Sequence, residues 1–169
     1  MKIGNQPHNT ASIMPSAMQA LVLYATLTGN TKKVARAMAE ELNAPAVDVR
    51  REPVPDLTGV GLLVVGDGVY FGRPSRAMIR ALQGLPPLPG VRAAVFGTYG
   101  AWPQQRRKLE RLLAAKGMEI IGQFFCPGVD ALFYPLRVGR PSEGDLERAR
   151  AFARELARKA GYLPSESSR

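Results

Sequence analysis

The residues best suited to chemistry in this chain are three threonines, Thr26, Thr28 and Thr31, which surround Gly29. An apolar run precedes them and a helical pattern follows, so we expect a tight loop between a buried strand and a helix N-terminus. A helix N-terminus presents unpaired N–H groups and the positive end of a dipole, and a glycine lets the backbone close around a ligand. One threonine would only cap the helix, but three exceed what capping needs. The stretch therefore predicts a phosphate site made of neutral donors.

The sequence also indicates which class of phosphate-containing ligand the loop could bind. It lacks Gly-x-x-x-x-Gly-Lys-Ser/Thr, which would reach the β- and γ-phosphates of a nucleotide and seat Mg²⁺. It also lacks the Gly-x-Gly-x-x-Gly of dinucleotide sites. A single phosphomonoester fits the loop better than either.

Two later loops hold a large share of the aromatic residues: Tyr70, Phe71, Tyr99 and Trp102. They follow the third and fourth expected strands, and the carboxyl-end loops of central parallel strands meet at one edge of a sheet. Flat aromatic rings beside a phosphate site suit a planar ring system, which stacking and burial would hold. For Phe71, a place in the hydrophobic core is an equally good interpretation.

The elements that must position these loops alternate between strand and helix. Apolar runs predict strands over 20–23, 45–49, 60–66, 91–96 and 118–125, and we expect residues 126–128, Cys-Pro-Gly, to break the last one. Helical spacing predicts helices over 32–43 and 104–116, one from Ser75 to Gly84 and one after Ser142. Residues 50–59 are expected to be a proline-rich connection. This alternation predicts an α/β fold, a parallel sheet with helices on both faces.

Length and composition indicate a single globular domain. The 169 residues suffice for one sizeable core, and an apolar content of 46% with 22% charged residues is ordinary for such a domain. No apolar run approaches the ~20 residues that span a bilayer. We expect residues 1–19 to be a disordered tail, 20–162 to be the domain and 163–169 to fray.

Single residues exclude several kinds of site. Cys126 is the only cysteine, so no internal disulfide can form and a reducing cytoplasm fits. His8, the only histidine, lies in the expected tail, which excludes a Ser-His-Asp or Cys-His site in the domain. The net charge is +9, but the basic residues are scattered and not interleaved with aromatics, so we expect solvated helix faces rather than a nucleic-acid site.

The stretch from Val22 to Met38 resembles the flavodoxin signature: two apolar residues, an aromatic, then Thr-x-x-Gly-x-Thr, with Ala35 at the expected place. Met38 stands where that pattern usually has Leu, Ile or Val. The resemblance spans about Ala20 to Tyr162. It implies a flavodoxin-like, doubly wound, five-stranded parallel sheet in the order 2-1-3-4-5. It also implies that the 26–31 loop holds the phosphate of FMN.

The segment from Phe96 to Gly100 resembles the flavodoxin loop that borders the isoalloxazine ring, where an aromatic commonly covers a ring face. Tyr99 is the first candidate for that role and Trp102 the second, and Tyr70 or Phe71 would cover the other face. No catalytic residue and no metal ligand is expected. The residues expected to contact FMN are Thr26, Leu27, Thr28, Gly29, Asn30, Thr31, Asp67, Gly68, Val69, Tyr70, Phe71, Gly72, Thr98, Tyr99, Gly100 and Trp102.

The resemblance implies a cytoplasmic FMN-binding redox protein that shuttles electrons between protein partners, a reductase and an acceptor, and that binds neither nucleic acid nor membrane. Carriers of this family are typically acidic, so the charge of +9 departs from the pattern and favours partners with acidic docking faces. The alternative is an FMN-dependent NAD(P)H oxidoreductase acting on quinones or flavins, since the loop of residues 66–75 resembles the corresponding loop of such reductases. A third hypothesis is a flavin-free interaction module, against which the intact 26–31 loop argues.

Overall fold

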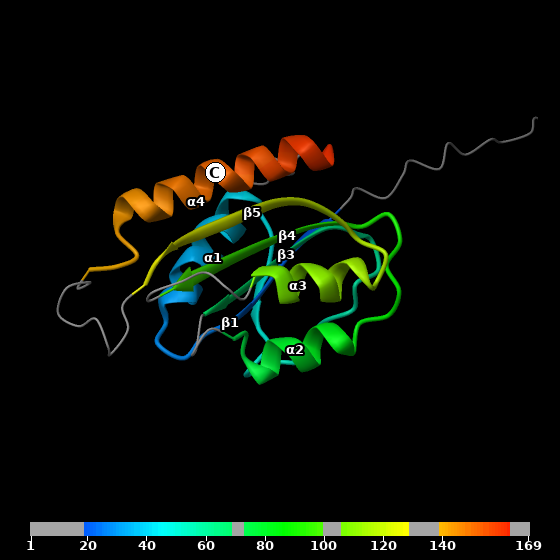
Figure 1. Ribbon diagram of the computed structural model, residues 1–169. Helices are drawn as coiled ribbons and strands as arrows, with labels where there is room; N and C mark the ends of the chain where they lie inside the picture. The colour runs from blue at the N-terminus through cyan, green and yellow to red at the C-terminus, as the bar shows by residue number, and fades with distance from the viewer. Residues whose placement is uncertain (1–18, 69–72, 100–105, 129–138, 163–169) are drawn as a thin grey trace, which may run out of the picture.

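The computed structural model of the chain describes residues 19–68, 73–99, 106–128 and 139–162 (Figure 1). Of the tails predicted over 1–19 and 163–169, residues 1–18 and 163–169 lie outside these ranges and stay predictions, whereas Gln19 is the first residue of β1. Within the ranges the regular elements are β1 (Gln19–Ala25), α1 (Asn30–Glu41), β2 (Ala46–Asp48), β3 (Val60–Gly68), α2 (Arg76–Gln83), β4 (Arg92–Tyr99), α3 (Arg106–Ala114), β5 (Glu119–Pro127) and α4 (Glu143–Ala160).

The strands form one five-stranded sheet in the order β2-β1-β3-β4-β5, and every neighbouring pair is parallel. This confirms the expected doubly wound order. The three central strands are β1, β3 and β4, so their carboxyl ends lie side by side. Ala25, Asp67 and Gly97 stand in register across them at that edge.

Helices cover both faces of the sheet, as Figure 1 shows. Successive strand residues point to opposite faces, so each central strand contributes to two cores. In β1, Val22 and Tyr24 pack on the side of α1 and α4. Leu21 and Leu23 pack on the other side, with the buried residues of α2 and α3. Burial on both faces explains why these strands read as continuous apolar runs.

Four strands run further toward the site than the apolar runs indicate, and the first of them, β1, continues to Ala25. β3 includes Asp67 and Gly68, and β4 continues to Tyr99. The prediction that residues 126–128 break the fifth strand was wrong, because Cys126 pairs with Thr98 and Pro127 with Tyr99 in the β4–β5 ladder. β5 is an edge strand, so Pro127 can lack an N–H donor without leaving a neighbour unpaired.

The connection from β2 to β3, residues 49–59, contains no helix. We call it the strap. Two of its side chains, Val49 and Val54, pack half-buried against the core on the α2–α3 side, and Leu57 is buried there. The strap therefore crosses the sheet on this face and corresponds to the predicted proline-rich connection. A crossover between parallel strands usually contains a helix, which is missing from the strap.

Candidate functional site

The loop between β1 and α1 ends on a glycine cap. Gly29 is the N-cap of α1 and has φ +85°, a left-handed conformation that favours glycine. Its N–H donates to Thr26 Oγ1 at 2.9 Å. A Cβ placed on Gly29 would meet no atom of the described residues within 4 Å, so those residues leave the space in front of the cap open.

The start of α1 also lacks the usual neutralising groups. The described residues provide it with no side-chain cap, and its first turn contains no acidic residue. By contrast, the hydroxyl of Ser75 caps α2 by accepting from Met78 N at 3.2 Å. The positive end of the α1 dipole is thus left for a ligand that carries negative charge.

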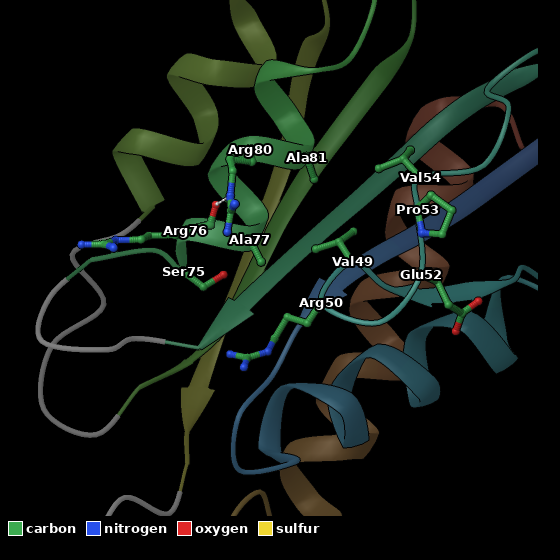
Figure 2. Close-up of a pocket in the computed structure, with 10 residues that line it drawn as sticks. All are labelled: Val49, Arg50, Glu52, Pro53, Val54, Ser75, Arg76, Ala77, Arg80 and Ala81. Carbon is green, nitrogen blue, oxygen red and sulfur yellow. Dashed lines mark hydrogen bonds between the residues drawn. The ribbon is translucent and has the colours of Figure 1, made fainter.

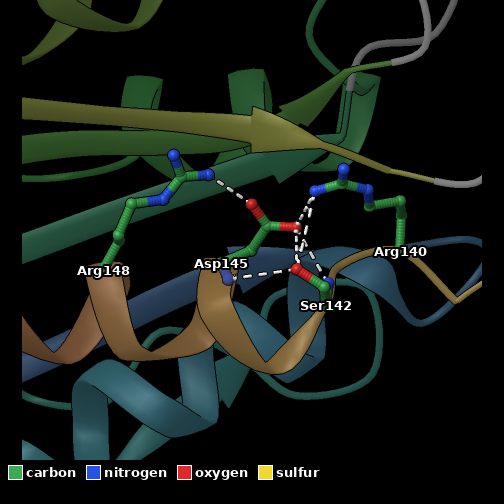
Figure 3. Close-up of polar contacts among 4 residues, drawn as sticks. All are labelled: Arg140, Ser142, Asp145 and Arg148. Atoms are coloured by element: carbon green, nitrogen blue, oxygen red, sulfur yellow. Dashed lines mark hydrogen bonds and ion pairs between the residues drawn. The ribbon is translucent and has the colours of Figure 1, made fainter.

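The start of α4 shows the opposite arrangement (Figure 3). Ser142 Oγ accepts from Asp145 N at 3.3 Å, and Asp145 Oδ2 accepts from Ser142 N at 2.8 Å, which together make a capping box. Arg140 donates to the same carboxylate at 2.7 Å, and Arg148 pairs with its other oxygen. Burial raises the pKa of Asp145, but the hydrogen bonds from Ser142, Arg140 and Arg148 lower it to about 2.

The three threonines of the loop have different surroundings. Thr31 Oγ1 lies 3.0 Å from Thr98 Oγ1, both residues are buried, and either hydroxyl can donate. This bond joins the start of α1 to the end of β4. Thr28 is exposed, and Thr26 is half-buried with its oxygen accepting from Gly29. Thr28 is therefore the hydroxyl most open to a ligand, whereas Thr31 also holds the loop in place.

The expected site residues missed Gly128, which follows β5. Its N–H donates to Tyr99 O at 3.0 Å, and a Cβ there would lie 3.1 Å from Thr98 Cβ and 3.2 Å from Asn30 Nδ2. Any larger residue at position 128 would need Thr98 or Asn30 to move by a few tenths of an ångström, so the packing of this segment beneath them favours glycine. The glycine is visible in the sequence, but its neighbours come from distant segments.

Asp67 lies at the end of β3 with no exposed surface. Ser75 N donates to its Oδ2 at 2.6 Å, which ties the end of β3 to the start of α2. Burial raises the pKa of Asp67 to about 7, against the lowering effect of the Ser75 hydrogen bonds. Asp67 thus sits at the expected edge, and its observed contact positions α2.

The structure brings together the carboxyl ends of β1, β3 and β4, with the loop of residues 26–31, Asp67, Gly68, Thr98 and Tyr99. Tyr99 is half-buried at the end of β4. The other expected contacts, Val69, Tyr70, Phe71, Gly72, Gly100 and Trp102, lie outside the described residues. Stacking of the aromatic rings on a flavin therefore stays a prediction.

Two other kinds of site find no support in the described part of the chain. No group of three or more His, Cys, Asp or Glu side chains there is arranged to hold a metal ion. None of the helices there combines the length and the apolar run that crossing a bilayer needs.

The start of α1 fits the phosphate of FMN. The helix lacks a side-chain cap from the described residues, Gly29 leaves space in front of it, and the nearby hydroxyl groups are neutral.

Known proteins share both the sequence and the fold. An uncharacterized protein of Methanocaldococcus jannaschii is 30% identical over 149 residues, 82% of this chain and 98% of that protein. The coenzyme F420H(2) oxidase of Methanothermobacter marburgensis is 27% identical over 144 residues, 75% of this chain but 36% of that protein. A flavodoxin from the domain Archaea has the same fold, with a TM-score of 0.64 at 16% identity, over 86% of this chain and all of that one.

The sequence model of the flavodoxin family matches residues 22–152, most of the chain. Flavodoxins are flavin-binding redox proteins, and both the strand order and the loop at the start of α1 agree with that assignment. This chain therefore belongs to the flavodoxin family.

Proposed function

We propose that this protein binds FMN and shuttles electrons between protein partners. The observation that carries the proposal is the start of α1, where a left-handed glycine, an open space and the absence of an acidic residue leave the helix dipole for a phosphate. Membership of the flavodoxin family supports a flavin as the group attached to that phosphate.

The chain's own residues would bind and orient the cofactor. The N–H groups at the start of α1 and the exposed Thr28 hydroxyl would hold the phosphate, and the Thr31–Thr98 hydrogen bond would keep that loop against β4. Tyr99, at the end of β4, would lie against a ring face. Bound FMN supplies the one- and two-electron chemistry, and the protein tunes it.

The charge of the molecule bears on its partners. At +9 the chain would be steered toward protein partners with acidic docking faces, and such steering weakens with ionic strength. We therefore expect the rate of electron transfer to an acidic redox partner to fall as salt is added.

The first test compares FMN with riboflavin, which lacks the phosphate. The purified protein is titrated with each, and binding is followed by the visible flavin spectrum after desalting. We expect FMN to be retained at about one molecule per chain and riboflavin to bind at least 100-fold more weakly, because a charged hydrogen-bonded group is lost.

The matched variants are Thr28→Val and Thr58→Val. Both threonines are exposed, but Thr58 lies in the strap and its hydroxyl bonds Asp56 at 2.9 Å. We expect Thr28→Val to weaken FMN about tenfold without changing riboflavin, and Thr58→Val to change neither. Absence of retained FMN would overturn the proposal. Rapid reduction of the bound flavin by NADPH alone would favour the alternative function, an NAD(P)H oxidoreductase, over an electron carrier.

A further inference from the structure

A cavity of about 610 Å³ lies between the strap and α2, on the face of the sheet opposite α1 (Figure 2). The volume is within the roughly 300–1,000 Å³ of small-molecule sites. The cavity is distinct from the loop at the start of α1, because residues 26–31 do not line it.

The cavity exists because the strap is thin. A helix in this crossover would fill the space beside α2, but residues 49–59 carry two prolines and no helix. The strap covers the sheet with Val54 and Leu57 and leaves the side of α2 uncovered. The gap therefore follows from the path of the backbone and needs no rearrangement of side chains to form.

The middle of the cavity is apolar. In Figure 2, two valines of the strap face two alanines of α2 across the gap: Val49, Val54, Ala77 and Ala81. All four are half-buried. The alanines are four residues apart, so they lie on one face of the helix. Their small side chains keep the gap open.

Cations flank this apolar middle. Arg50 extends from the strap toward the carboxyl edge of the sheet, and Arg80 lies along α2, where its Nε donates to Arg76 O at 3.4 Å. Glu52 also lines the cavity, but its carboxylate points away from the gap. Within the described ranges neither Arg50 nor Arg80 forms an ion pair, whereas the neighbouring Arg51 pairs with Asp48 at 3.8 Å.

We propose that the strap–α2 cavity is a binding site for a small organic anion that has an apolar body. The body would lie between the two valines and the two alanines, and the carboxylate, sulfonate or phosphate would meet Arg50, while Arg80 adds positive charge on the α2 side of the cavity. Guanidinium groups favour planar and tetrahedral anions, and an apolar body supplies the burial that an exposed ion pair lacks. The site does not depend on the proposed flavin function.

The test uses 8-anilinonaphthalene-1-sulfonate, a fluorescent anion with an apolar body. The full-length protein, saturated with FMN where it retains FMN, is titrated with the dye, and amide chemical shifts locate the bound dye. We expect one saturable site, shifts concentrated in residues 49–54 and 75–81, and binding that weakens with added salt. The neutral analogue N-phenyl-1-naphthylamine should bind at least tenfold more weakly.

Paired variants separate this cavity from general dye adsorption. Arg50→Gln should weaken the dye about tenfold and Arg51→Gln should leave it unchanged, since Arg51 does not line the cavity. Ala81→Leu should fill the gap and weaken the dye at least tenfold, while Ala151→Leu, at an exposed alanine of α4, should have no effect. Leu keeps the helix propensity of Ala, and Ala77→Leu repeats the test should Ala81→Leu unfold the chain.

Equal weakening by Arg50→Gln and Arg51→Gln would overturn the proposal, as would undiminished binding to both leucine variants. Chemical shifts confined to residues 26–31 would also overturn it, because the dye would then occupy the proposed phosphate loop. The protein could fail to retain FMN and still bind the dye beside the strap. That result would contradict the proposed function and would support this inference.

Discussion

The helices α1 and α4 lie on the same face of the sheet, but only α4 has acidic residues and a side-chain cap at the positive end of its dipole. The first turn of α4 includes Glu143 and Asp145, and a capping box with Ser142 satisfies its backbone. At the start of α1 stand Gly29, Asn30 and Thr31, with no acidic residue in the first turn and no side-chain cap from the described residues. The difference separates a helix start that is complete within the chain from one that can receive an anion.

A buried carboxyl group lies near each helix start, and the pKa values of the two groups are shifted in opposite directions. Asp145 is 1% exposed and meets two arginines, so it is stable as an anion. Asp67 is fully buried at the edge where β1 and β3 end, and the charge of Arg50 is the weakest of the effects that lower its pKa. One region stabilises its own negative charge, and the other, beside the proposed phosphate loop, disfavours it.

The largest expected effect concerns Asp67 and pH. An unfolded Asp has a pKa near 4, whereas burial raises the pKa of Asp67 to about 7 in the folded protein. Between these values the native state keeps a proton that the unfolded chain has lost. The stability contributed by this group is therefore present below pH 4 and is lost as pH rises through 7, by up to about 4 kcal/mol.

Urea unfolding of the wild type and Asp67→Asn from pH 4 to pH 8 checks this. Because Asn does not titrate, the wild-type free energy of unfolding should fall relative to the variant across that range. A constant difference between the two proteins would show that Asp67 titrates normally, and would remove the contrast with Asp145.

A second prediction gives α1 the negative charge that α4 carries. Position 29 is open to a side chain but left-handed, and Asn and Asp tolerate that conformation better than other residues. Gly29→Asp should weaken FMN about 100-fold relative to Gly29→Asn, because the carboxylate repels the phosphate. Fluorescence titration measures this, with riboflavin as the control ligand that should not distinguish the variants. Equal affinity of the two variants for FMN would place the phosphate elsewhere.

A third prediction concerns a variant that removes the charge of Asp145 at the start of α4. Asp145→Asn should lower the free energy of unfolding by about 2 kcal/mol at pH 7, because the cap and two charged hydrogen bonds are weakened. The pKa of Asp145 is about 2 when folded and near 4 when unfolded, so its contribution is present above pH 4 and is lost as pH falls toward 2.

The matched control for Asp145 is Glu147→Gln on the same helix. Glu147 pairs with Arg150 and Arg154 but its side chain is 60% exposed, so water screens these pairs and its replacement should change the free energy of unfolding far less than Asp145→Asn does. Chemical denaturation at pH 7 and pH 2.5 compares the two variants. Similar losses for both would mean that burial adds nothing to the Asp145 cluster.

Much of the fold was predictable because its signals are local. Continuous apolar runs marked β1, β3 and β4, and apolar spacing marked the helices, so the alternation is confirmed. The predicted loop lies where expected, except that its last two residues, Asn30 and Thr31, already belong to α1. The strand order followed from resemblance to the family rather than from any pattern in the residues. The proline-rich connection predicted over residues 50–59 is also confirmed, and the structure adds Val49, which was expected in the second strand.

The errors concern features that depend on distant partners. Residues 126–128 contain Pro and Gly, which usually end a strand, but pairing of Cys126 with Thr98 extends β5. Gly128 escaped notice as a site residue because Asn30, which it packs beneath, is far away in the sequence. The cavity beside the strap was equally unforeseen, since it is bounded by two segments that no local pattern connects.

The order of the elements could be predicted from the sequence, because hydrophobic periodicity acts over a few residues. The glycine and hydroxyl side chains of residues 26–31 are equally local, and the phosphate chemistry that they indicate stays a prediction. Tertiary structure alone decided where β3, β4 and β5 end, that Thr31 bonds Thr98, and that a cavity separates the strap from α2. The physical reason is that strand pairing, close packing and cavities depend on which distant residues become neighbours, and the packed sheet sets those neighbours.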